Sequence, residues 1–357
     1  MRNKKTLALA VTLALGGAHT AIASGVDDSI RWNGFMSAVA AVSDSKSIYL
    51  EDINQDMGIR DYRFGLSMSK KLGENWNVAA LLIAHEGEEQ IVLHWGMATY
   101  QFNDHVKVAL GKQKFMNTVV SEYYHVGYAY PWVRPPQEFY GIQSLGPNMS
   151  IDAMNGASVS LRTTSNDIEY TLQPFMGVSD LPAESGQLKK LVGVKGSAGT
   201  DVVVVQAAYF QGMLNVANSP DRAFVDGKNL KTWTLGSTLN WKNMIGYLEY
   251  GKSSISGFTE FDTDAGYATL GYKIGQYLPY VTYAQFEQDS GLAQKSTYLG
   301  LRHELNSFTS LKVEWQRIDP TQRSTPLPSG AQPAGLFEAM PDKSIVNLLS
   351  LGVDLTF

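Results

Sequence analysis

The sequence predicts an all-β protein, a transmembrane antiparallel up-and-down β-barrel of 16 strands, and three observations favour this fold class. The chain begins with an export signal, and no later apolar stretch is long enough for a membrane-spanning helix. Short segments that alternate apolar and polar residues recur up to the last residue. A β-strand needs only about 9 to 11 residues to cross a bilayer, and its side chains point alternately to the lipid and to the barrel interior. Repetition of such segments therefore predicts a barrel.

The first segment of the chain has the composition of a secretory signal peptide, which is removed from the mature protein. Three basic residues precede an apolar run at residues 6–15, and small residues follow. This run is too short for a membrane-spanning helix, which needs about 20 residues. We therefore expect a signal peptide at residues 1–23 and a single barrel domain at residues 24–357.

The composition narrows the possible functions. The chain has no cysteine, which excludes disulfides and thiolate metal sites. Its 34 acidic and 29 basic residues argue against a nucleic-acid partner. Its few histidines belong to no recognisable nucleophile motif, so we expect neither an enzyme nor a bound cofactor. His85 and His94 could face each other within one hairpin, but such a spacing is too common to predict a metal site.

The alternating pattern is clearest at the C-terminus, where residues 349–357 place aliphatic residues and the terminal Phe357 on one face. Residues 91–98 likewise place Leu93, Trp95 and Met97 on one apolar face, with His94 on the other. The even number of strands brings both ends of the chain to the same side of the membrane. The sixteen candidate strands are residues 30–42, 62–69, 76–82, 91–98, 106–110, 157–162, 168–176, 191–197, 202–211, 231–241, 244–252, 266–274, 277–288, 297–303, 311–317 and 345–357.

The connections between these segments alternate in length. Short turns, such as residues 72–75 and 242–243, follow the even-numbered candidate strands. Long loops, such as residues 213–229 and 319–343, follow the odd-numbered ones. Short periplasmic turns opposite long external loops are typical of an outer-membrane barrel. We therefore expect this protein in the outer membrane of a Gram-negative cell.

The third long connection, residues 114–152, interrupts the alternation for nearly forty residues. It contains seven aromatic residues, three prolines and the two acids Glu122 and Glu138 between residues 122 and 140. Loops longer than about 15 residues are uncommon and tend to be functional or disordered. Disordered segments are depleted in aromatic residues, so a functional loop is favoured.

These features resemble the Gram-negative porins, the sixteen-stranded trimeric diffusion channels of the outer membrane. The resemblance is specific at three motifs: the alternating last strand that ends in Phe357, Leu-Gly-Lys-Gln at residues 110–113, and Pro-Gln-Glu-Phe-Tyr-Gly at residues 136–141. The last two are similar to the porin Leu-Gly-Arg-Gln and to the porin loop tip Pro-Glu-Phe-x-Gly. The resemblance implies that loop 114–152 folds inward and narrows the channel, and that Phe357 is the signal read by the barrel-assembly machinery. It also implies a homotrimer, surrounded by outer-membrane lipid and lipopolysaccharide.

The same resemblance matches Glu138 to the constriction acid of the loop tip, and Lys112 and Arg162 to basic positions on the facing wall. The expected constriction residues are these three together with Glu122, Arg134 and Arg63. The strand pattern raises one difficulty: if Val108 and Leu110 face lipid, so does Lys112, unless a bulge changes its direction. Apart from the resemblance, charges on the polar faces of strands must point inward, because a base at mid-depth in lipid costs about 2 to 4 kcal/mol. The expected lumen-lining residues of this kind are Lys107, Glu169, Lys195, Glu249 and Arg302.

The expected function is a water-filled channel for the passive diffusion of small hydrophilic solutes and ions, since a sixteen-stranded barrel is wide enough to hold one. Two alternatives remain open, namely a channel selective for a sugar, a dicarboxylate or phosphate, and a barrel that serves mainly as a surface receptor or adhesin. A selective channel predicts a saturable current that the substrate blocks, whereas a receptor predicts almost no current. The sequence leaves the sign of any ion selectivity open.

Overall fold

The computed structural model describes residues 30–50, 52–85, 91–141, 152–181, 186–218, 222–327 and 329–357. The signal peptide expected at residues 1–23 lies outside these residues and stays a prediction. No helix in the described ranges is long and apolar enough to cross a membrane.

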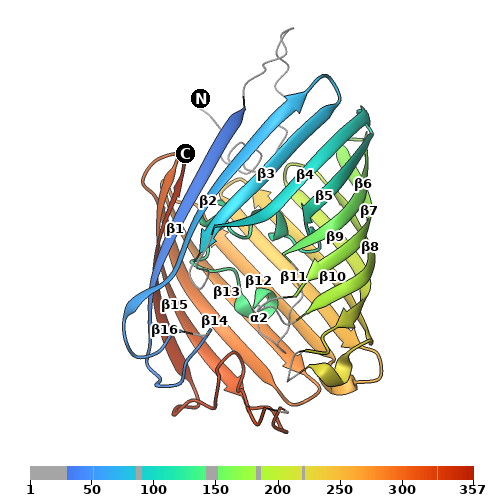
Figure 1. Ribbon diagram of the computed structural model, residues 1–357. Helices are drawn as coiled ribbons and strands as arrows, with labels where there is room; N and C mark the ends of the chain where they lie inside the picture. Colours follow the sequence, from blue (N-terminus) through green and yellow to red (C-terminus); the bar gives the residue numbers. More distant parts are fainter. Residues whose placement is uncertain are drawn as a thin grey trace.

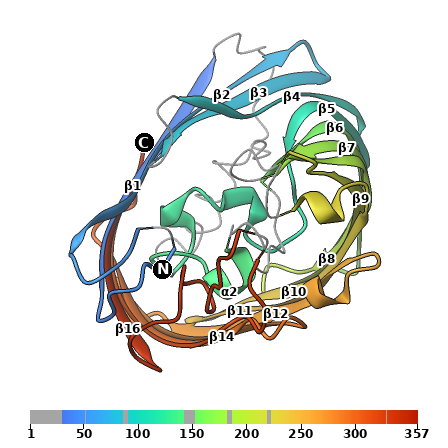
Figure 2. The same cartoon turned by 60° about the horizontal axis from the view of Figure 1, so that its bottom comes forward.

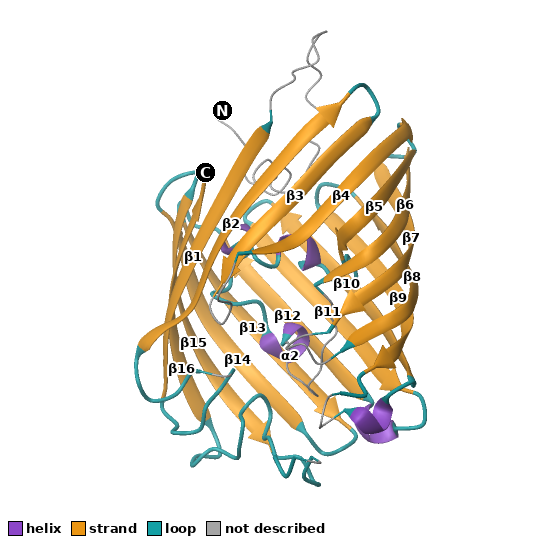
Figure 3. Ribbon diagram, in the orientation of Figure 1, coloured by secondary structure: helices purple, strands orange, loops and turns teal. Residues whose placement is uncertain are grey.

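Sixteen antiparallel strands close into one barrel (Figures 1 and 3). Each strand pairs with its neighbours in sequence, and β1 pairs with β16 to complete the ring. The structure thus confirms the predicted fold class and the number of strands. The strands are β1 Arg31–Ser43, β2 Gly58–Leu72, β3 Trp76–His85, β4 Val92–Asn103, β5 Val106–Lys114, β6 Ala153–Ser165, β7 Ile168–Asp180, β8 Gln187–Gly199, β9 Val203–Asn215, β10 Asn229–Trp241, β11 Met244–Ile255, β12 Thr263–Tyr272, β13 Tyr277–Gln288, β14 Ala293–Glu304, β15 Thr309–Thr321 and β16 Val346–Thr356.

Strand β13 shows how the sequence period of two builds the wall of the barrel. Its residues alternate without interruption between exposed and buried side chains. Val281 and Tyr283 lie on the exposed outer face, whereas Thr282 and Ala284 point inward and are fully buried. Side chains on a strand point alternately to opposite faces, so the apolar set meets the surroundings and the other set meets the interior.

Strand β4 departs from this alternation at a β-bulge. Leu81 of β3 pairs with Trp95, but the next residue, Leu82, pairs with Leu93, so His94 has no partner of its own across the ladder. Beyond the bulge the two faces exchange, and Trp95 is only 8% exposed and packs inside with Val126 of the long loop. The prediction that Trp95 lies on the same outer face as Leu93 is therefore wrong, because a one-residue insertion reverses the direction of every later side chain.

The described part of the long third connection, residues 115–141, lies inside the barrel (Figure 2). It contains three single helical turns, η1 Ser121–Tyr123, η2 Gly127–Ala129 and α2 Gln137–Tyr140. Two further turns, η4 Ala223–Val225 and η5 Thr259–Phe261, belong to other long loops. Helix α2 contacts β12, β13 and β14, so the loop follows one side of the inner wall.

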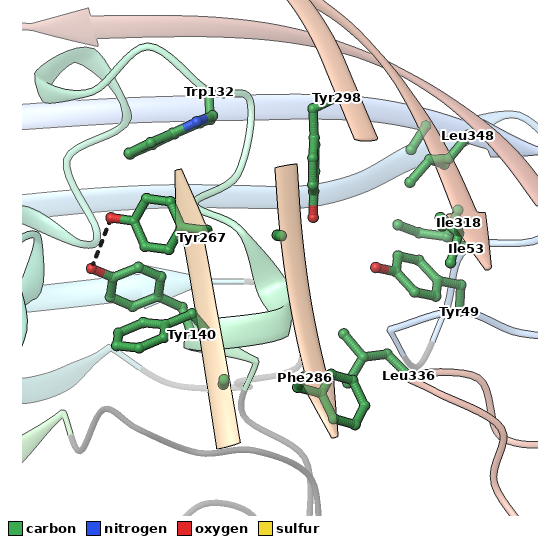
Figure 4. Close-up of a cluster of buried hydrophobic side chains, with 14 of the residues drawn as sticks. Tyr49, Ile53, Trp132, Tyr140, Tyr267, Phe286, Tyr298, Ile318, Leu336 and Leu348 are labelled. Carbon is green, nitrogen blue, oxygen red and sulfur yellow. Dashed lines mark hydrogen bonds between the residues drawn. The ribbon is translucent and has the colours of Figure 1, made fainter. Parts of the chain in front are cut away.

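An aromatic cluster joins this loop to the wall (Figure 4). Trp132 has no exposed surface, and its indole Nε1 donates to the hydroxyls of Thr269 at 3.1 Å and Thr282 at 2.9 Å. The Tyr140 hydroxyl lies 3.5 Å from that of Tyr267 on β12. Buried tyrosine and tryptophan normally find partners for their polar atoms, and here these partners come from the barrel wall. The loop aromatics therefore act as packing residues.

Candidate pore site

Glu138, the acid expected at the tip of the constriction loop, has no exposed surface. Its carboxylate accepts hydrogen bonds from the Tyr298 hydroxyl at 2.5 Å and from Nε2 of Gln294 at 2.6 Å, and both donors lie on β14. The side chain thus points from α2 toward the wall. The structure places Glu138 in the contact between loop and barrel, where it anchors the loop and does not face the open interior.

Basic residues of the wall bind the backbone of the same loop. Lys312 on β15 donates to the carbonyls of Gly127 at 2.6 Å and Trp132 at 2.7 Å, and its ammonium lies 2.9 Å from Asp354 on β16. Both charged groups are almost fully buried, and a buried charge is tolerated only when it is paired and hydrogen-bonded. These contacts hold the middle of the loop against β15 and β16.

Two residues expected to line the lumen point inward as predicted but lie beneath the loop. Arg302 donates to the carbonyl of Tyr130 at 3.3 Å and is 4% exposed. Glu249 accepts from the backbone N–H of Val119 at 2.7 Å and from the hydroxyls of Tyr267 and Tyr140. They therefore support the loop and have little contact with the open interior.

Arg63 and Arg134, both predicted at the constriction, meet at one acid. Nη2 of Arg63 lies 2.6 Å from Oδ2 of Asp61, and Nε of Arg134 lies 3.7 Å from the same oxygen. Arg63 also donates to the Tyr124 carbonyl at 3.4 Å, and Arg134 donates to Ser350 at 3.3 Å. The structure thus brings the predicted pair together, with Asp61 between them on the side of the loop next to β2 and β16.

Lys112 lies on the outer face of the barrel. It pairs with Gly96, and its ammonium donates to the Leu93 carbonyl at 3.0 Å. Leu110, two residues earlier on the same face, is half exposed. The positive φ of Gly111, 124°, does not turn the lysine inward. The structure therefore corrects the expectation that Lys112 faces the constriction loop, as the parity of the strand had already indicated.

Arg162 points inward but lies far from the tip of the loop, near a short turn. Its backbone N–H donates to the His105 carbonyl at 2.8 Å, beside the turn that precedes β5. Its Nε lies 3.4 Å from Oε1 of Glu169, and the two side chains are about half exposed, at 51% and 49%. Arg162 and Glu169 therefore form an accessible ion pair on the inner wall near the end of the barrel that carries the short turns.

Three of the predicted residues border the uncovered part of the interior. Lys107 on β5 and Lys195 on β8 are exposed or partly exposed, and Glu122 of the loop is partly exposed. The ammonium of Lys114, at the end of β5, donates to the carbonyl of Glu122 and fixes the start of the loop. Of the two loop acids, the structure thus leaves Glu122 accessible and buries Glu138.

The terminal residue Phe357 takes part in closing the barrel. Its N–H and carbonyl exchange hydrogen bonds with Gly34 of β1 at 3.0 and 2.7 Å. A Cβ at position 34 would lie 2.3 Å from the Phe357 ring, so the glycine leaves room for the ring in its present position. This position is compatible with the predicted role in assembly, which stays a prediction.

Sequence reasoning missed two residues of a cluster around His94, namely His125 of the loop and Asp152 just before β6. The His94 and His125 rings are 4.4 Å apart between centroids, and Nε2 of His125 lies 3.5 Å from Oδ1 of Asp152. Burial holds the pKa of His125 below its ordinary value. No sequence spacing could have found this cluster, since its members come from a strand and from both halves of the long loop.

Comparison with family models and with curated proteins finds no match to the chain. Solved structures do match. The anion-selective porin from Comamonas acidovorans aligns with a TM-score of 0.62 at 15% identity, covering 92% of this chain and 99% of that one. OmpF of Salmonella typhi, in complex with daunomycin, aligns with a TM-score of 0.59 at 12% identity, covering 92% and 97%. OmpT of Vibrio cholerae, an outer membrane protein in its trimer form, aligns with a TM-score of 0.58 at 13% identity, covering 92% and 99%. At these identities the similarity shows the fold: the chain has the barrel architecture of the outer-membrane porins.

Proposed function

We propose that this protein is an outer-membrane porin that forms a water-filled channel for the passive diffusion of small hydrophilic solutes and ions. The channel runs between the described part of the loop, residues 115–141, and the inner wall of β5 to β9. The observation that carries this proposal is the division of the inner wall into a covered part and an accessible part.

The covered part comprises the inner faces of β12 to β16. Inward-facing residues there are buried, with Thr282, Tyr298 and Lys312 at no more than 3% exposed, because the long loop and neighbouring loops pack on this wall. The accessible part lies on β6 to β8 toward the short turns, where inward-facing residues such as Arg162 and Lys195 retain exposed surface, whereas Phe175 and Leu191 of the same strands are buried in a second apolar cluster. Water must reach such side chains for them to be exposed inside a closed barrel, which supports an aqueous path on this side.

The charges along this path favour a weak preference for anions. Arg162 and Glu169 form a pair with each other, and this leaves Lys107 and Lys195 on the wall opposite Glu122 on the loop. Charged groups in a pore select ions through their electric field, and among these unpaired charges bases outnumber acids by one. The small excess suits a general channel better than one selective for a single solute. One structural neighbour, the Comamonas acidovorans protein, is itself described as anion-selective.

We further propose that the protein assembles as a homotrimer. We also propose that it acts as a channel and catalyses no reaction. The trimer form of the OmpT neighbour supports this assembly. The exposed Trp32, Trp233, Trp241 and Trp315 lie on the outer surface, where tryptophan favours the lipid interface. Outer-membrane lipid, lipopolysaccharide and the barrel-assembly machinery are the partners that this location requires.

The test is a planar-bilayer recording of the purified protein under a salt gradient, with sugars, dicarboxylates and phosphate added as blockers. We expect stepwise channel openings, a small reversal potential of the anion-preferring sign, and no block by any single solute. Glu122→Gln should strengthen the anion preference and Lys107→Gln should abolish it. Lys295→Gln, which changes a base on the outer face of β14, is the matched control and should have no effect. A silent bilayer would contradict the proposal, and a saturable block would replace it with a selective channel.

A further inference from the structure

We propose that His94, His125 and Asp152 form a binding site for one divalent transition-metal ion, such as Zn²⁺, that links the long loop to the barrel wall. The three residues come from separate segments. His94 lies in the bulge of β4, His125 lies in the loop between η1 and η2, and Asp152 is the last residue before β6. The site joins one strand to two points of the loop.

The geometry of the cluster is close to that of a metal site. One ligand atom from each residue lies within 4.8 Å of the ligand atoms of the other two. Ligands of tetrahedral zinc, at bond lengths of about 2.0 to 2.2 Å, lie about 3.3 to 3.5 Å apart. The distance of 3.5 Å between Nε2 of His125 and Oδ1 of Asp152 already has this value. Closing the remaining distance requires only a small movement of the loop, which carries two of the three ligands.

The ring nitrogens of the two histidines provide a second, independent observation. Nε2 of His94 and Nδ1 of His125 are buried and have no hydrogen-bond partner within the described part of the chain, and Nε2 of His125 faces only Asp152, at 3.5 Å. His125 is only 8% exposed, so bulk water does not compensate for this loss. Buried polar atoms are nearly always paired, and an unpaired one requires an explanation such as an ion. A metal bound to these nitrogens satisfies them.

His94 lies in the β-bulge of β4. Alternation from the outward Leu93 already places His94 on the inner face, and the bulge leaves it without a partner across the ladder, with its ring edge to face with that of His125 at an interplanar angle of 79°. Bulges occur preferentially next to functional sites, where they change the direction of a side chain. The same bulge places Trp95 inside, against Val126, and so holds the neighbouring part of the loop.

The donor set and its surroundings define the class of metal. Two imidazoles and one carboxylate leave a fourth position for water, which is the pattern of an accessible zinc site. Imidazole suits zinc, nickel and copper, whereas magnesium and calcium prefer oxygen ligands. Arg63 and Lys114 are close enough to act on His125 through their charge, which disfavours an ion held by electrostatic attraction alone. The site therefore suits a metal with strong bonds to nitrogen.

Calorimetric titration of the untagged, purified full protein with ZnCl₂ tests the site without relying on channel activity. We expect one Zn²⁺ per chain and no binding of Mg²⁺. His94→Asn and His125→Asn should each weaken Zn²⁺ binding at least about tenfold, since even the loss of an outer-sphere partner costs about 10- to 100-fold. His105→Asn, at an exposed position beside a short turn, is the matched control and should bind like the wild type.

Asp152→Asn keeps the shape of its side chain, and so provides a second variant if the histidine changes impair folding. Zinc binding that is equal in the wild type and in the His125 and Asp152 variants would overturn the proposal, as would a wild type that binds no zinc.

The effect of bound zinc on the channel rests on the proposed function and is measured separately. Micromolar ZnCl₂ should reduce current fluctuations of the wild type by at least about twofold and leave the His125 variant unchanged. A protein that binds zinc but forms no channel would contradict the proposed function and support the metal site.

Discussion

Replacing Glu138 with alanine should detach the tip of the long loop from the barrel wall and leave ion selectivity nearly unchanged. The carboxylate is the shared acceptor for Tyr298 and Gln294. Without it, the buried Tyr298 hydroxyl loses its acceptor, which costs about 1 to 3 kcal/mol, whereas Nε2 of Gln294 keeps the Tyr49 hydroxyl at 3.2 Å as an acceptor. Glu138→Ala should therefore weaken the attachment by about 1 to 3 kcal/mol. A loss of 2 kcal/mol raises the population of the detached loop about 30-fold.

Limited digestion with chymotrypsin measures this population, because the loop is rich in aromatic residues that are buried while it stays attached. We expect Glu138→Ala to be cleaved in the loop several times faster than the wild type, and its channels to show larger current fluctuations. Glu122→Ala is the matched control: it removes a partly exposed acid of the same loop, and should shift the reversal potential without faster cleavage. Equal cleavage of Glu138→Ala and wild type would refute the anchoring role. A shift in reversal potential as large as that of the Glu122 variant would return Glu138 to the pore.

Three further changes test other contacts. Lys312→Met leaves the buried Asp354 without its cation and should lower the free energy of unfolding by about 3 to 5 kcal/mol, measured by thermal unfolding in detergent. An unchanged free energy of unfolding would show that the ion pair is dispensable. Trp132→Phe removes the donor to two threonine hydroxyls and should cost about 1 kcal/mol in the same assay, with unchanged stability as the contrary result. Deletion of Phe357 should reduce the amount of assembled protein in the outer membrane because β16 loses its last pair of hydrogen bonds with Gly34, and normal surface levels would count against an assembly role.

The sequence predicted the strands well because the information for each strand is local. Alternation of apolar and polar residues over about ten positions identifies a strand, and turn residues mark where it ends. All sixteen strands were therefore predicted. The bulge at His94 could not be predicted, since one inserted residue leaves an apolar pattern that still looks regular. Trp95 reads as an outward residue in sequence and is an inward one in the structure. Only the pairing with β3 reveals the exchange of faces.

The candidate site was predicted in part. The sequence identified the third long loop and the two acids in it. The direction in which each acid points, however, depends on contacts between residues far apart in sequence. Glu138 meets Tyr298 across 160 positions. Glu122 lies in the same loop and stays accessible, and no local pattern separates the two. The outward position of Lys112, by contrast, followed from strand parity, and there the parity was a better guide than the motif.

The attachment of the loop to one side of the barrel divides the inner wall into two sets of positions with different freedom to vary. Inward-facing residues of β12 to β16 are part of a packed core, so most substitutions there should impair folding. On β6 to β8, the inward-facing residues that stay exposed, such as Arg162 and Lys195, can change in size or charge at small cost in stability, whereas Met154, Phe175 and Leu191 are buried in a second apolar cluster. A library randomised only at the exposed inward-facing positions of β6 to β8 should yield mostly folded barrels with diverse permeability. Natural variants could adapt to new solutes by substitutions at the same positions.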